Sequence, residues 1–196
     1  MSIFNAIRID STGIINIDAG WTLPERLAML ECLTTDFPIF YQRLNSGHGD
    51  PVDAISPAIA EQDIQRIEQL LGVPLPHSYK RFLRCTGGLC LLGGAVNLSF
   101  PPFIHDFPPF AALTREHQSH IIGPWPPASH GLLCVGDFWL EGDGDQVLFD
   151  IRQGLHKGEY PVLYYDHEAW PASIRLIASS FRDWLERILT DDDFTK

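Results

Sequence analysis

The chain has 196 residues, 45% of them hydrophobic and 20% charged, which is typical of an ordinary soluble domain and excludes a disordered chain. The net charge of −11 argues against direct nucleic-acid binding, because that function needs a basic surface over the phosphates, and it suits a basic partner. No run approaches the ~20 apolar residues of a membrane helix. The N-terminal segment also lacks the apolar stretch of a signal peptide.

The first 50 residues are predicted to form an N-terminal extension. Residues 3–9 and 14–17 are rich in β-branched residues and favour a short hairpin. Thr22 is placed to cap a helix whose apolar face carries Leu27, Leu30 and Leu33. The aromatic stretch 37–44 is short, and its pattern does not decide between a helix and a strand. Residues 45–51 are predicted to be a flexible connector to a second unit, residues 51–196.

Two consecutive helices are predicted between residues 56 and 88. The first has Ser56 as its cap, with Ile64, Ile67 and Leu71 on one face, and Gly72 supplies the left-handed turn that ends it. The second begins after Leu75–Pro76, and Gly87–Gly88 ends it. We expect its apolar face to be buried against the first helix and the last one; that face consists of Tyr79, Phe82 and Leu83.

The remainder predicts a sheet and a final helix. Residues 89–100 indicate two strands around Gly93–Gly94, and an unusual proline-rich insertion follows at 101–127. Three more strands are expected at 132–138, 146–150 and 161–166. Short connections favour antiparallel pairing. Ser180, with Asp183 three residues on, is expected to open the last helix.

A spaced motif runs through the helical pair: Glu68, then Leu71-Gly72-x-x-Leu75-Pro76, Tyr79, Phe82-Leu83 and Gly87-Gly88. Together with Gly142-Asp143-Gly144-Asp145 and the stretches 161–168 and 178–181, it resembles the SMI1/KNR4 family of the SUKH superfamily over roughly residues 56–189. The resemblance implies an α+β fold: a central sheet, antiparallel with a mixed sheet as the alternative, packed by two N-terminal helices and a C-terminal helix. Thr86 departs from the asparagine that the family often has there.

Catalytic and metal-binding patterns find little support. His117 and His120 are spaced to share a helix face, and His105, His130 and His167 could join them only through the fold, but no zinc-binding spacing is present. The acidic turn at 141–145 fails the spacing of a calcium loop. The sequence shows no nucleophile elbow and no phosphate loop. We therefore predict no catalytic residue, no metal site and no cofactor. Hydrolysis by a pair of carboxylates stays an open alternative, because acidic residues are plentiful.

The four cysteines show no paired spacing, which favours reduced thiols and a cytoplasmic protein. Cys85 and Cys134 lie in apolar runs and are expected to be buried.

What stands out is an acidic segment with interleaved aromatic residues. Residues 137–170 contain eight acidic and two basic residues, net −6. Aromatic side chains among charges suit a protein interface, although the aromatic residues could equally belong to the core. The predicted partner-binding residues are Asp137, Trp139, Glu141, Asp143, Asp145, Tyr164, Asp166, Glu168 and Trp170. The carboxylates at 143 and 145 are expected to be exposed on a glycine turn.

The resemblance implies a non-enzymatic bacterial immunity protein that binds and neutralises a cognate toxin, often a nuclease. An acidic face would suit a basic toxin surface. The alternatives are a small hydrolase that uses His and Asp/Glu side chains, and a regulatory scaffold of the kind that fungal members suggest. The sequence does not fix the toxin or the oligomeric state.

Overall fold

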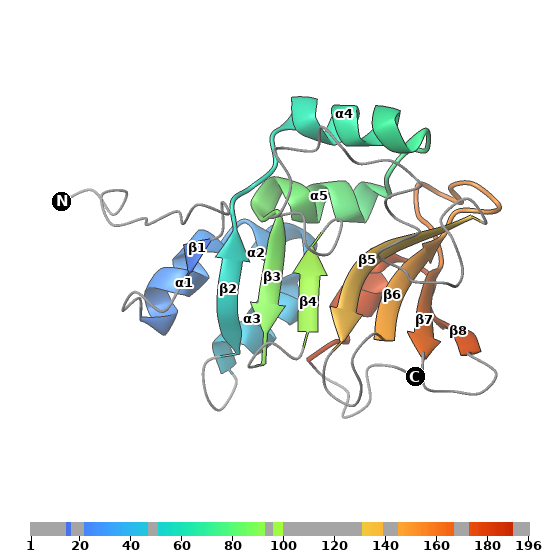
Figure 1. Cartoon of the computed structure of the whole chain (residues 1–196). Helices are drawn as coiled ribbons and strands as arrows, with labels where there is room; N and C mark the ends of the chain where they lie inside the picture. The colour runs from blue at the N-terminus through green and yellow to red at the C-terminus, as the bar shows by residue number, and fades with distance from the viewer. Residues whose placement is uncertain are drawn as a thin grey trace.

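The protein is an α+β domain in which helices pack on an antiparallel sheet (Figure 1). The computed structural model describes residues 15–16, 22–46, 51–92, 96–99, 131–138, 145–166 and 173–189. The described helices are α1 (Leu23–Met29), α2 (Leu33–Asp36), α3 (Pro38–Ser46), α4 (Glu61–Leu71), α5 (His77–Cys85) and α7 (Phe181–Leu185). The described strands are β1 (Ile15–Asn16), β2 (Val52–Ser56), β3 (Gly88–Leu91), β4 (Val96–Ser99), β5 (Leu132–Phe138), β6 (Asp145–Asp150), β7 (Val162–Asp166) and β8 (Ser173–Ala178).

The described strands form one sheet of eight, and each strand pairs with the next one in the sequence. Every pair is antiparallel, so the antiparallel sheet expected from the short connections is confirmed. The strands expected at 132–138, 146–150 and 161–166 are present, and the two strands expected in 89–100 are β3, which begins one residue earlier, and β4. The insertion 101–127 lies outside the described residues.

One hydrophobic core joins the described helices to one face of the sheet. Its centre is aromatic: Phe82 lies between Tyr79, Phe37 and Phe181, with ring centroids 6.2, 6.3 and 5.3 Å away. The predicted burial of Tyr79, Phe82 and Leu83 is confirmed, since none is more than 1% exposed. The core includes residues of α1 to α3, so the N-terminal helices and the rest of the chain share it; the division at residue 50 stays a prediction.

The first N-terminal helix begins as the sequence predicts, but it ends at Met29, and Leu33, expected on the same helix, lies in α2. The Glu25 carboxylate accepts hydrogen bonds from the backbone N–H and the hydroxyl of Thr22, which fixes the start of α1. The stretch 37–44, which the sequence left unassigned, forms most of α3.

The start of the first central helix was predicted wrongly. Ser56 does not cap α4; it ends β2, opposite Gly88 of β3, and α4 begins at Glu61. The reason is that the carbonyl of Ser56 accepts hydrogen bonds from Gly87 N–H and the Thr86 hydroxyl, so this residue is held in the sheet. The helix ends as predicted, with Gly72 at φ 67°. α4 then packs on α5 (Figure 1).

Two strands escaped the sequence analysis. β2 follows the predicted connector, residues 45–51, and ends at the predicted helix cap Ser56, and β8 precedes the last helix. Ile15 and Asn16, in the second half of the predicted N-terminal hairpin, form β1 and pair with Ile55 and Ala54 of β2. Residues 3–9 lie outside the described part of the chain. The last helix begins as predicted: the Ser180 hydroxyl accepts a hydrogen bond from Asp183 N–H at 3.0 Å.

Candidate functional site

The predicted partner-binding residues gather around β5, β6 and β7. Asp137 lies in β5 opposite Gln146, and Asp145, Tyr164 and Asp166 lie in β6 and β7. The other predicted residues lie outside the described part of the chain: Trp139, Glu141, Asp143, Glu168 and Trp170. The structure therefore brings together the ends of three neighbouring strands that carry Asp137, Asp145 and Asp166.

Asp145 is not the exposed carboxylate that the glycine turn suggested. It is the first residue of β6, only 7% exposed, and its carboxylate accepts a hydrogen bond from the Tyr164 hydroxyl. Tyr164 is itself 6% exposed. The expectation of exposure is wrong because the strand begins one residue earlier than predicted, and this places the side chain on the sheet rather than in the turn.

A cation lies over the ring of Tyr164. Arg175 of β8 lies opposite Tyr164 in the register, with its guanidinium carbon 4.6 Å from the ring centroid. Such a contact stabilises a charge placed over an aromatic face. Asp166 shares the Tyr164 face of β7, because residues two apart on a strand point the same way. The result is a compact group of Asp145, Tyr164, Asp166 and Arg175 across three strands.

The electrostatics of this group hold the tyrosine proton in place. Burial raises the pKa of Tyr164, and so do its hydrogen bond to Asp145 and the charges of Asp145 and Asp166; Arg175 opposes them. The pKa of Tyr165 is raised by burial and by the same two carboxylates. Tyr164 therefore stays a hydrogen-bond donor at neutral pH, and its role here is to fix the Asp145 carboxylate.

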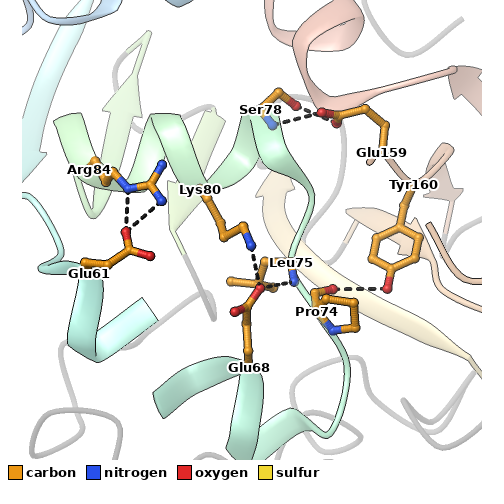
Figure 2. Close-up of polar contacts among 9 residues, drawn as sticks. All are labelled: Glu61, Glu68, Pro74, Leu75, Ser78, Lys80, Arg84, Glu159 and Tyr160. Atoms are coloured by element: carbon orange, nitrogen blue, oxygen red, sulfur yellow. Dashed lines mark hydrogen bonds and ion pairs between the residues drawn. The ribbon is translucent and has the colours of Figure 1, made fainter. Parts of the chain in front are cut away.

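A second polar cluster lies at the start of α5 (Figure 2). Glu159 accepts hydrogen bonds from the backbone N–H and the hydroxyl of Ser78, at 2.8 and 2.6 Å. The hydroxyl of the next residue, Tyr160, donates to the carbonyl of Pro74 at 3.0 Å. Glu159 belongs to the acidic segment 137–170, but its carboxylate caps the start of α5 and therefore stabilises the fold.

The carboxylates of α4 hold the two central helices together (Figure 2). Glu68 accepts from the backbone N–H of Leu75 at 2.7 Å and pairs with Lys80 at 2.9 Å. Glu61 pairs with Arg84 at 2.6 Å. Glu68 of the sequence motif thus fixes the turn between the helices, so a structural role rather than a catalytic one explains its place in the motif.

Within the described residues, no group of three or more His, Cys, Asp and Glu side chains is placed to hold a metal ion. The histidines weighed above as metal ligands, at 105, 117, 120, 130 and 167, lie outside these ranges. Cys134 is fully buried, as predicted, and its thiol donates to the carbonyl of Gly136. None of the described helices is long and apolar enough to cross a membrane.

An antiparallel meander packed by a helical pair, with Glu68 bridging that pair, defines the class of α+β domain that the sequence motif indicated. The chain belongs to the SMI1 / KNR4 family (SUKH-1), whose sequence profile matches residues 58–187. The comparison with curated proteins finds no match.

Proposed function

We propose that this chain is a non-enzymatic bacterial immunity protein that works in the cytoplasm by binding a cognate toxin with a basic surface. Membership of the SMI1 / KNR4 family (SUKH-1) carries the proposal, because SUKH proteins generally act as immunity proteins rather than as enzymes. The net charge of −11 supports a basic partner, since opposite potentials speed association.

The proposed contact surface is the acidic end of the sheet, where β5, β6 and β7 bring Asp137, Asp145 and Asp166 together. Its supporting group is the buried Asp145–Tyr164 pair, which holds neighbouring strands at this end. Charge for the partner is then supplied by Asp137 and Asp166, and by the predicted residues Glu141, Asp143 and Glu168. Trp139 and Trp170 are the proposed aromatic contacts, since buried aromatic residues dominate many interfaces.

Co-purification tests the proposal directly. The tagged protein is co-expressed with the product of the adjacent reading frame, restricted to its basic C-terminal domain, and the complex is isolated at low and at high salt. The proposal expects a stoichiometric complex that protects cells from the toxin domain. The same preparation is assayed for phosphoester and carboxylester hydrolysis. Turnover by the isolated protein, with no complex formed, would support the hydrolase alternative instead.

A matched variant separates partner binding from folding. Tyr164→Phe keeps the ring but removes the hydroxyl that donates to Asp145, so it should weaken the complex if the acidic end is the interface. Tyr160→Phe removes a hydroxyl that donates to Pro74, at the helical end of the domain, and serves as the control. Equal affinity of the two variants for the toxin domain would move the interface away from Tyr164.

A further inference from the structure

Cys32 and Cys85 come from the two parts of the chain that the sequence analysis separated. Cys32 is exposed and directly precedes α2, while Cys85 is half-buried and is the last residue of α5. Neither thiol is used by the proposed function. The packing of α2 on α5 brings the two thiols near each other, although 53 positions separate them in the sequence, and Cys32 contributes to the raised pKa of Cys85.

The packing of α2 on α5 sets this contact. Asp36 of α2 pairs with Arg81 of α5 at 2.6 Å, and the next residues along, Phe37 and Phe82, have ring centroids 6.3 Å apart. Cys32 lies four residues before Asp36 and has helical backbone angles, φ −58° and ψ −22°.

Cys85 lies four residues after Arg81 on α5. Because residues four apart share a helix face, the ion pair of Asp36 with Arg81 places Cys32 opposite Cys85 one turn further along.

We propose that Cys32 and Cys85 form a reversible disulfide that fastens the N-terminal helices to the core helix α5 under oxidising conditions. The oxidant is of the peroxide class. The exposed Cys32 thiol attacks the peroxide, the O–O bond breaks, and Cys32 becomes a sulfenic acid with release of one water. The Cys85 sulfur then attacks the Cys32 sulfur, the S–O bond breaks, and a second water carries away the Cys85 proton. Two electrons pass from the thiols to the peroxide.

The order of these steps follows from exposure. Burial raises the pKa of the Cys85 thiol to about 12, and contact with Cys32 and the charge of Asp36 add to this. Cys85 is therefore protonated at neutral pH, and the thiolate form is the one that reacts with oxidants. The exposed Cys32 is the first to react, and Cys85 is the residue that resolves it.

The test uses the full chain, treated with hydrogen peroxide and then with dithiothreitol. The reduced protein has four thiols, and we expect two after oxidation, with one intramolecular peptide pair that joins Cys32 to Cys85 and has lost two hydrogens. The link should raise the Tm by roughly 5 °C or more, because it restricts the unfolded chain, and dithiothreitol should reverse the shift.

Two single variants make the result specific. Cys32→Ser should abolish both the linked peptide and the Tm shift, whereas Cys90→Ser, a change at a half-buried cysteine of β3, should keep both. The proposal is overturned if the two lost thiols map to another pair, if the product is a disulfide between two chains, or if the link forms equally well in urea-unfolded protein.

Discussion

Truncation of Phe82 tests the centre of the packing account. The side chain is fully buried, and its ring contacts Phe37, Tyr79 and Phe181 with centroids 5.3–6.3 Å apart. Phe82→Ala removes the ring and leaves a cavity that three aromatic neighbours cannot readily fill. Fully buried Phe→Ala changes cost about 3–5 kcal/mol, so the free energy of unfolding should fall by that amount.

Urea unfolding followed by tryptophan fluorescence measures this loss from the midpoint, provided that the slope m stays unchanged. The matched control is Arg81→Ala, one residue earlier in α5, which removes an ion pair whose arginine side chain is 54% exposed. Exposed pairs contribute about 0–1 kcal/mol, so the control should lose no more than that. A loss below about 1 kcal/mol for Phe82→Ala would mean that the helical pair does not form the centre of the core.

Two further predictions concern a turn and the response to pH. Gly158→Ala should destabilise the protein far more than Gly154→Ala in the same unfolding assay. Both glycines have positive φ, but a Cβ at 158 would lie 2.5 Å from His77 Nδ1, whereas a Cβ at 154 meets nothing within 4 Å. Equal losses of unfolding free energy for the two variants would refute the clash. Burial raises the pKa of Tyr79 and Tyr164, so the stability they contribute is complete below the unfolded tyrosine pKa of about 10 and is lost as pH rises through the folded values. Urea midpoints should therefore fall above about pH 10, and a constant midpoint up to about pH 12 would contradict this.

The sequence predicted the elements whose ends are set locally. Gly72 and Ser180 mark helix ends with groups close in the chain, and the 3.6-residue period of Tyr79, Phe82 and Leu83 fixed the buried face of α5. β2 and β8 were missed because a short strand depends on the strand it pairs with. The partner of β2 is β3, which is distant in the sequence, and the pairing of β8 with β7 contains a register shift.

The candidate site was harder to predict for a similar reason. The burial of Asp145 depends on Tyr164, 19 residues away, and the Glu159 contact with Ser78 spans 81 residues. Nothing in the local sequence separates a carboxylate that holds the fold from one that faces a partner. The available signal for the cysteine contact was the spacing of four residues from Cys32 to Asp36 and from Arg81 to Cys85. This spacing becomes meaningful only once α2 is known to pack on α5.

The central claim is that the acidic end of the sheet steers a basic toxin, and association kinetics test it. Asp143 lies outside the described residues and is a predicted contact, whereas Glu31 is exposed between α1 and α2 and is not part of the acidic segment 137–170. The measurement compares Asp143→Lys with Glu31→Lys, which carry the same change of charge, by stopped-flow mixing with the toxin domain at several salt concentrations. The account predicts slower association and a flatter salt dependence for Asp143→Lys, with Glu31→Lys close to the parent. If Asp143→Lys associates as fast as the parent at low salt, the acidic end is not the interface.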